Sequence, residues 1–423
     1  MKTLHRIFLE GKMEQKREQL YIGIDINDRY AMISYYQLNM SEPETVSTIA
    51  GSEHYQIPTL LAKRKNIGQW YYGDDARKMA KTSEVICVDS LLKRAVNGEN
   101  IRIEDDTYEA WELLALFLKK VIDLPQKLGN AYGCDRLILS VERLSRANME
   151  VFWKIAPKLG LLPEQFMVID HKESFYYFAL SQPESLWIHD VYLFETEGKN
   201  IHYYGLKRDT RTTPQVVSIK ESIKTPIEEQ KDAEFLCLLQ KAFENQIVTT
   251  VYLVGEGFEG GWMKDSLTYI CRGRRAFMGN NLYSKGACYA GYIRDHGENW
   301  NCIYMGENEM KFNLSLKIRE RGNLSFYTLI SAGKNWFETR GECEVILAGT
   351  GEIDFWKQLP NSREAVIETL ELTDLPSRPD RTTRLRITAT PVSDEKIEVK
   401  IRDLGFGEIY RSTDKVWKLT MTM

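Results

Sequence analysis

Apolar and polar positions alternate over residues 21–300 in a way that predicts strands and helices in turn. Runs rich in β-branched and aromatic residues end at polar turns, which is typical of strands. We expect strands at 21–26, 30–36, 135–141 and 166–170. Between them, residues 107–122 and 145–160 carry apolar side chains at helical spacing, with Thr107 suited to an N-cap and Gly160 to a C-cap. This alternation predicts a sheet covered by helices.

A second round of the same pattern begins at residue 187. A hairpin, a long helix and an apolar strand are expected at 187–206, 226–246 and 248–257. Asp25 and Asp190 each lie on a strand with its own turn, and an apolar strand of similar length follows each of them. We interpret this recurrence as an internal duplication of pattern. It predicts two similar α/β lobes that face a cleft lined by Asp25 and Asp190.

After about residue 305 the pattern changes to short alternating strands separated by Gly, Asn and Asp turns. No long helix is expected there, so residues 301–423 are predicted to form an all-β domain, a sandwich. The polar segment 294–311 marks the boundary before it. A content of 43% hydrophobic and 27% charged residues indicates a globular chain with more than one core.

Charge and cysteine content narrow the class of protein. The net charge of -4 does not favour nonspecific binding to nucleic acid. The seven cysteines never occur as CxxC, which argues against a disulfide framework and a zinc site. Residues 1–20 lack the apolar core of a signal peptide, and no later run is long enough to span a bilayer. We therefore expect a cytoplasmic protein without nucleic-acid or membrane partners, with 1–20 as an N-terminal extension.

Several stretches resemble, in the same order, the seventy-kilodalton heat-shock chaperones of the actin, hexokinase and sugar-kinase ATPase superfamily. YIGIDINDRYAMISYY (21–36) resembles their first phosphate-binding hairpin, and VYLVGEGFEGG (251–261) resembles their adenosine loop. Residues 134–180 lie where the chaperones have a strand, a helix and a connecting segment. The resemblance covers nearly the whole chain, and its specificity comes from the order of its parts.

The resemblance implies a fold of the α/β plus all-β class. A two-lobed actin-like ATPase domain, made of two ribonuclease-H-like lobes, is implied for 21–300. Lobe I then covers about 21–185 and lobe II, in a reduced form, about 186–300. A β-sandwich similar to the chaperone substrate-binding domain follows at 301–423.

The nucleotide motifs of this chain depart from the family pattern. Asp25 remains at the position that orders the water shell of Mg²⁺ in the family. However, Asn27, Asp28 and Arg29 replace the glycine and hydroxyl residues that bind phosphate there. The second hairpin is assigned to Asp190, which is followed by bulky side chains instead of glycines.

The residues at catalytic positions are also changed. His171 stands where the family has a glutamate that positions water, and Asp89 where it has a phosphate-facing lysine. Efficient ATP hydrolysis is not expected without that lysine, because phosphoryl transfer depends on positioned cations. The adenosine loop, with Gly255, Glu256 and Gly257, is the least changed part. The implied ligand is ATP or ADP with Mg²⁺, and no cofactor is required if the site is a relic.

Three functions remain open at this point. The first is a pseudo-ATPase scaffold or chaperone-like protein whose sandwich binds a peptide or protein partner. The second is an ATP-binding switch or slow ATPase with a phosphate site rebuilt around Arg29 and Asp25. The third is an actin-like assembly protein, which is disfavoured because the sandwich would need a place in a filament. The partner, the pathway and the oligomeric state are not determined by the sequence.

Overall fold

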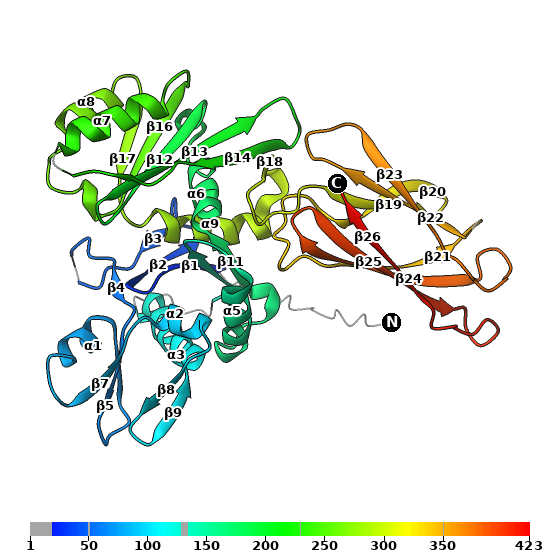
Figure 1. Ribbon diagram of the computed structural model, residues 1–423, viewed down its shortest axis with the longest axis horizontal. Coiled ribbons are helices and arrows are strands. Elements are labelled where there is room, and N and C mark those ends of the chain that lie inside the picture. Colours follow the sequence, from blue (N-terminus) through cyan, green and yellow to red (C-terminus); the bar gives the residue numbers. More distant parts are fainter. Residues whose placement is uncertain (1–18, 50, 128–133, 229, 350) are drawn as a thin grey trace, which may run out of the picture.

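The computed structural model describes residues 19–49, 51–127, 134–228, 230–349 and 351–423. Two α/β units lie one above the other in Figure 1, and a C-terminal β unit extends away from them. The predicted extension at 1–20 falls almost entirely outside the described residues. Within these ranges, no helix has the length and apolar character that a membrane crossing requires.

The first α/β unit is built on a six-stranded sheet with the order β11-β10-β1-β2-β3, in which β4 also pairs with β2. Its strands are β1 (Leu20–Ile26), β2 (Tyr30–Gln37), β3 (Glu44–Thr45), β4 (Ile57–Pro58), β10 (Arg136–Val141) and β11 (Phe166–Asp170). β1, β10 and β11 run parallel, whereas β2 is antiparallel to β1 and β3 is antiparallel to β2. Every residue of β1 is buried, since helices cover both faces of the sheet.

Nine α-helices and four short 3-10 helices occur in the described residues. They are α1 (Gly73–Met79), α2 (Leu91–Val96), α3 (Ala110–Ile122), α4 (Leu124–Lys127), α5 (Arg146–Lys158), α6 (His171–Leu180), α7 (Lys231–Ala242), α8 (Lys264–Ile270), α9 (Leu282–His296), η1 (Pro163–Gln165), η2 (Glu184–Leu186), η3 (Glu256–Phe258) and η4 (Gly297–Asn299). α3 and α5 share a core with Ile22 and Ile24 of β1. α9 packs on the opposite face, where Gly23 is required because a Cβ would clash with the α9 backbone.

The second α/β unit repeats the strand order of the first. Its sheet runs β17-β16-β12-β13-β14-β18, and β15 pairs with β13. The strands are β12 (Asp190–Glu197), β13 (Asn200–Asp209), β14 (Gln215–Glu221), β15 (Thr225–Pro226), β16 (Val248–Val254), β17 (Arg275–Met278) and β18 (Cys302–Tyr304). Here too, three antiparallel strands, β14, β13 and β12, are followed by β16 and β17 parallel to β12.

Two helices connect the two large sheets. α6 and α9 lie between the sheets in Figure 1. Phe175 of α6 and Tyr283 of α9 belong to a core shared with Val191 and Leu193 of β12. On its other side, α9 places Ala287 and Ala290 against β10 and β11. The carboxyl ends of β1 and β12 therefore both lie next to these two helices.

Smaller elements extend from the first unit at the bottom of Figure 1. They are β5 (Leu61–Arg64), β6 (Trp70–Tyr72) and β7 (Val85–Val88), which form one sheet, and the hairpin of β8 (Asn100–Ile103) and β9 (Asp106–Glu109). Thr107 lies in β9 and does not cap α3, whose N-cap is Glu109. Likewise, Pro226 belongs to β15, so the helix predicted from 226 begins at Lys231. In both places, pairing with a neighbouring strand prevails over local helix propensity.

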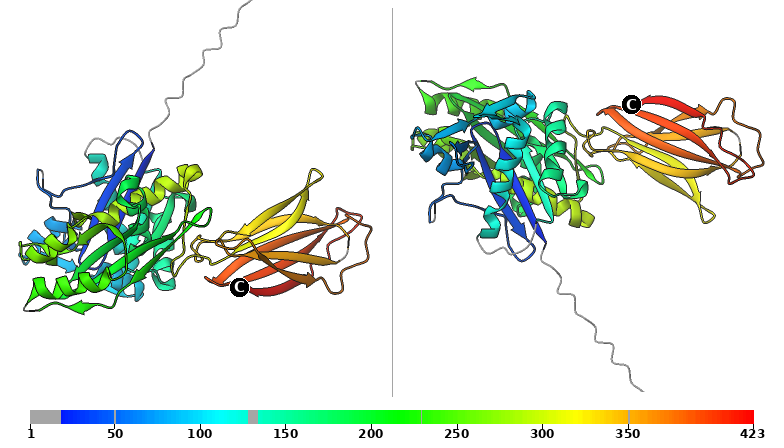
Figure 2. Two further views of the ribbon diagram at one scale, coloured as in Figure 1. Left: turned by 90° about the horizontal axis from the view of Figure 1, so that it is seen from above. Right: turned by 90° about the horizontal axis from the view of Figure 1, so that it is seen from below.

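The C-terminal unit consists of two four-stranded antiparallel sheets. One has the order β20-β19-β22-β23 and the other β21-β24-β25-β26. The strands are β19 (Asn313–Glu320), β20 (Asn323–Ile330), β21 (Gly341–Leu347), β22 (Glu352–Gln358), β23 (Ala365–Glu371), β24 (Thr383–Ser393), β25 (Lys396–Gly405) and β26 (Val416–Thr422). Inward residues of both sheets, including Leu316, Phe355, Ile387 and Val399, form one core. Figure 2 shows the two layers from above and below.

Candidate functional site

A buried chain of polar contacts links the two large sheets. Asp25, near the end of β1, is 1% exposed, and its Oδ1 lies 2.8 Å from Nε2 of His171, the first residue of α6. The imidazole of His171 stacks on the ring of Tyr283, with centroids 3.7 Å apart and an angle of 9° between the planes. The Tyr283 hydroxyl donates to Oε2 of Glu195 on β12 at 2.7 Å. Four side chains from β1, α6, α9 and β12 thus form one connected group.

Local structure explains why His171 lies at this position. Asp170, the last residue of β11, accepts a hydrogen bond from the Glu173 amide at 2.8 Å and so caps α6. The helix therefore begins directly at the carboxyl end of the sheet. Because β11, β10 and β1 are parallel, their carboxyl ends share one edge, and His171 enters the site beside Asp25.

Charges in this group stabilise one another. Burial by itself lowers the pKa of His171, but the charge and hydrogen bond of Asp25, with a further contribution from Glu195, raise it to about 9. Burial raises the pKa of Glu195, but the hydrogen bond from His202 and the charge of His171 lower it below its ordinary value. At neutral pH the imidazole of His171 is therefore protonated, next to Asp25, and its ring contact with Tyr283 links it to Glu195. Burial and the charge of Glu195 raise the pKa of Tyr283, which keeps its hydroxyl as a donor.

Side chains of the β1–β2 turn accept hydrogen bonds from backbone amides of the turn itself and of α2. Oδ1 of Asn27 accepts hydrogen bonds from the amides of Arg29 at 2.8 Å and Tyr30 at 3.0 Å. Oδ1 of Asp28 accepts from the amide of Lys93 at 2.8 Å, in the first turn of α2. These carboxylate and amide oxygens take the place of an anion at backbone N–H groups. Asn27 and Asp28 therefore have structural roles in the turn.

A cavity of about 290 Å³ opens beside the polar group. Its walls come from the β1–β2 turn, α1, β12 with the turn after it, and the segment after β16, and they include Arg29, Arg77, Glu195, Gly255, Glu256 and Gly257. Two of these glycines are required by packing. A Cβ on Gly255 or Gly257 would clash with Thr196, and the Gly257 amide donates to Oγ1 of Thr196 at 3.0 Å. Close approach of the chain to itself is thus enough to explain both glycines.

The structure does not bring Asp190 or Asp89 to this site. Asp190 is the first residue of β12, where it lies 3.5 Å from Lys207, and Glu195 is five residues further along, at a distance of about 17 Å. The prediction of a cleft lined by Asp25 and Asp190 is therefore wrong. Asp89 is exposed, before α2, with its carboxylate 3.7 Å from Arg94.

Glu195 is the member of this buried group that reasoning from the sequence missed. The recurrence of an Asp-bearing strand pointed to Asp190, which precedes the buried run of β12. The glycine at 198 and the polar residues around it, EGKN (197–200), mark the carboxyl end of the strand. Glu195 lies just before that turn, as Asp25 lies just before the turn at 27–29. A polar residue near the end of an apolar run, before a glycine turn, is the signal that identifies it.

Comparisons with known proteins divide the chain into two parts. A domain of unknown function (DUF8552) matches residues 309–423, which contain all eight strands of the C-terminal unit. No curated protein matches the chain. The model for the family of unknown function (DUF5716) C-terminal matches residues 42–307, including His171, Glu195 and Tyr283. Because this match spans more than half of the chain, the protein belongs to the family of unknown function (DUF5716).

Proposed function

We propose that this protein is a chaperone-like pseudo-ATPase that acts as a scaffold or binder for a peptide or protein partner in the cytoplasm. In this proposal the two α/β units are the lobes of an actin-like domain, and the C-terminal unit is a β-sandwich that holds the partner. The repeated strand order in two sheets around a shared pair of helices supports duplicated lobes. Seven free cysteines are in keeping with a reducing compartment.

The contact between His171 and Asp25 is the observation that carries the pseudo-ATPase proposal. A hydrated Mg²⁺ is usually held through carboxylates that are free to accept its waters. Here an imidazolium lies 2.8 Å from Oδ1 of Asp25 and supplies a positive charge at this carboxylate, while Oδ2 is buried without a hydrogen-bond partner among the described residues. A divalent ion beside Asp25 would also be repelled by His171. The residues present therefore do not fit Mg²⁺, and phosphoryl transfer without a metal loses most of its charge stabilisation.

The β1–β2 turn supports the same proposal. Phosphate binding at such a turn needs unpaired backbone N–H groups. The amides of Arg29 and Tyr30 already donate to Asn27, so a phosphate would have to displace that side chain. Asp28 lies in the same turn with its carboxylate directed to α2, and it adds negative charge close to any phosphate.

The cavity favours one alternative, a nucleotide-binding switch without efficient catalysis. Arg29 and Arg77 both line it, and each is exposed. Two guanidinium groups at one cavity can attract a phosphate, while the segment at Gly255 lies on the same wall. In this alternative the nucleotide binds through arginine contacts and not through Mg²⁺ at Asp25.

Isothermal titration calorimetry on the full chain distinguishes these functions. ATP and ADP are titrated with excess Mg²⁺ and again with EDTA, and phosphate release is followed over hours. We expect no phosphate release and no binding that depends on Mg²⁺. Binding that is equal in Mg²⁺ and EDTA, and is weakened in Arg29→Gln with Arg77→Gln, supports the switch. Tight Mg²⁺-dependent binding that is lost in Asp25→Asn, with the thermal unfolding temperature unchanged, would overturn the pseudo-ATPase proposal.

A further inference from the structure

The two outer faces of the C-terminal unit differ in character. On the sheet β21-β24-β25-β26, several charged residues neutralise one another, and the exposed Ile346 and Val416 lie apart on its two edge strands. Arg386 lies 2.6 Å from Glu344, Lys400 lies 2.7 Å from Glu398, and Arg402 pairs with Asp414. Paired charges spread over a face are typical of a surface in contact with water. We use this face, called the reference face, for comparison with the outer face of the other sheet.

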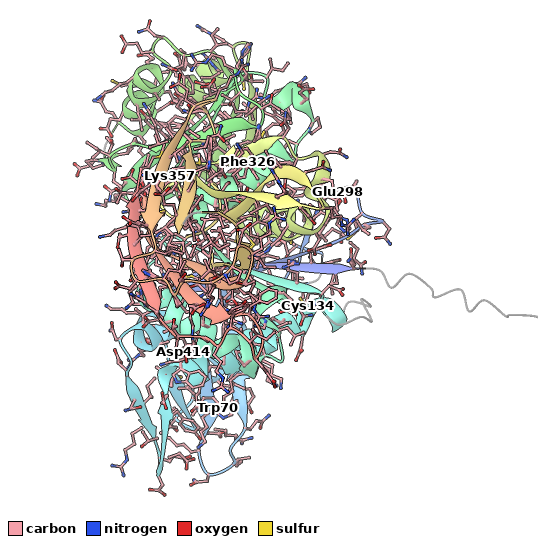
Figure 3. All side chains as sticks on the ribbon, turned by 90° about the vertical axis from the view of Figure 1, so that its right-hand side faces the viewer. Trp70, Cys134, Glu298, Phe326, Lys357 and Asp414 are labelled. Carbon is pink, nitrogen blue, oxygen red and sulfur yellow. The ribbon has the colours of Figure 1, made fainter. Side chains whose placement is uncertain are left out.

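The outer face of the sheet β20-β19-β22-β23 carries an apolar cluster. Leu324 is 62% exposed, Phe326 56% and Ile367 48%. The ring of Phe326 contacts that of Trp356 edge to face, with centroids 5.1 Å apart. Trp356 is directly opposite Ile367 on β23, so the cluster reaches from one edge strand to the other. Figure 3 looks onto the C-terminal unit from its outer end and labels Phe326.

Charges on this face are separated into two halves. Lys317 and Arg319 lie on β19, whose neighbour is the edge strand β20. Glu352 and Asp354 lie on β22, and Glu371 on β23. Within the described residues, none of these five side chains forms an ion pair; Asp354 accepts a hydrogen bond from Thr369 at 2.6 Å, and the Lys317 ammonium lies 5.8 Å from the centroid of the Trp356 ring. One half of the face is thus positive and the other negative, with the apolar cluster across both.

We propose that this face binds the same face of a second copy of the chain in a symmetric dimer. A twofold axis that lies in the face, parallel to the strands, exchanges the β19–β20 half with the β22–β23 half. Lys317 and Arg319 of one copy then oppose the carboxylates of the other. Trp356, on an inner strand beside the axis, meets its counterpart in the middle. A face that is complementary to itself in charge favours this partner over an unrelated protein.

The face is small for a stable interface. Two of the four strands have seven residues and two have eight. With strands about 4.8 Å apart and residues about 3.4 Å apart, the part of the face that all four strands share covers roughly 19 by 24 Å. The pair therefore buries on the order of 900 Å², below the usual size of a stable interface. We expect reversible association in the micromolar range, visible as a sedimentation coefficient that rises with concentration.

Charge reversal provides the test, with sedimentation velocity on the full chain. The double variant Lys317→Glu, Arg319→Glu places like charges opposite one another across the interface. The double variant Glu352→Lys, Asp354→Lys does the same. Each double variant should raise the dissociation constant of the dimer about tenfold or more. A mixture of the two variants should form a 1:1 heterodimer, because the reversed charges match again. Lys400→Glu, on the reference face, should leave association unchanged.

Other results would overturn the proposal. Circular dichroism checks that every variant keeps its β spectrum. A chain that stays monomeric up to near-millimolar concentration, or a dimer insensitive to both reversals, excludes this face as the interface. Growth of open polymers would show that an edge strand pairs between copies instead. If the two charge-reversed variants are folded but do not associate when mixed, the twofold arrangement is excluded.

Discussion

The imidazole of His171 and the carboxylate of Asp25 lie 2.8 Å apart, although 146 positions separate them in the chain. The first belongs to α6 and the second to β1, and both are buried. Stacking of His171 on Tyr283 extends this pair to Glu195 in the second sheet. The pair therefore connects the two α/β units at the place where the chaperone resemblance implies a metal and phosphates.

The first prediction concerns pH. The pKa of His171 is raised in the folded protein from 6.5 to about 9, so the folded state keeps a proton that the unfolded state releases. This stabilisation is complete below pH 6.5 and is lost as the pH rises through 9. The shift corresponds to about 3 kcal/mol. Thermal unfolding of the full chain should therefore show a falling transition temperature over this range.

Two histidine variants show whether this pH dependence comes from the pair of His171 and Asp25 or from other titrating groups. His171→Gln should be less stable than the natural protein at pH 6.5 and should show a flatter pH dependence. His189→Gln replaces an exposed histidine and serves as the control. The same slope in His171→Gln and in the natural protein would contradict the assignment.

The second prediction compares two aspartates near α2. Asp28 accepts the Lys93 amide in the first turn of α2, so Asp28→Ala should lower the free energy of unfolding by about 1 kcal/mol. Asp89→Ala removes only an exposed carboxylate 3.7 Å from Arg94 and should cost less than about 0.5 kcal/mol. Urea unfolding of both variants measures the difference. Equally small losses of unfolding free energy in both variants would mean that the hydrogen bond between Asp28 and the Lys93 amide does not stabilise α2.

The third prediction concerns Glu309, between the α/β units and the C-terminal unit. Its side chain is 1% exposed, and burial, together with the charge of Asp170, raises its pKa from 4.5 to about 8. The folded state again binds the proton more tightly, so stability falls as the pH rises from 4.5 to 8. The Glu309→Gln variant cannot ionise at this position. Its unfolding temperature should equal that of the natural protein at pH 4.5, and the difference in its favour should grow as the pH rises to 8. The exposed Glu298→Gln should follow the natural protein at every pH.

The fourth prediction concerns independent folding of the C-terminal unit. Its core contains residues from Met310 to Met421 and none from the α/β units. A fragment of residues 309–423 should therefore give a β-type circular dichroism spectrum and a cooperative thermal transition. A fragment of residues 312–423 lacks Met310, which is fully buried. Its free energy of unfolding should be lower by about 2–5 kcal/mol, and it should therefore melt at a lower temperature. A random-coil spectrum for the longer fragment would show that the unit depends on the α/β part.

Local pattern was enough to predict most strands and the change of architecture near residue 305. Alternating and continuous apolar runs report which side chains can be buried, and that depends on neighbours a few residues away. The strands expected at 21–26 and 30–36 are present as β1 and β2. Helix ends were harder, because Thr107 pairs with Arg102 in the β8–β9 hairpin and Pro226 pairs with Asn200 in β13, and neither residue is free to start a helix.

Tertiary structure alone decided which polar residues meet. Asp25 and Asp190 look alike in sequence, but one lies near the end of β1 and the other at the start of β12. Which end of a strand reaches a site depends on the register and direction of its neighbours, and these are set by packing over long distances in the chain. Glu195 therefore replaces Asp190 in the buried group, and His171 becomes the cation beside Asp25 only when α6 packs between the sheets.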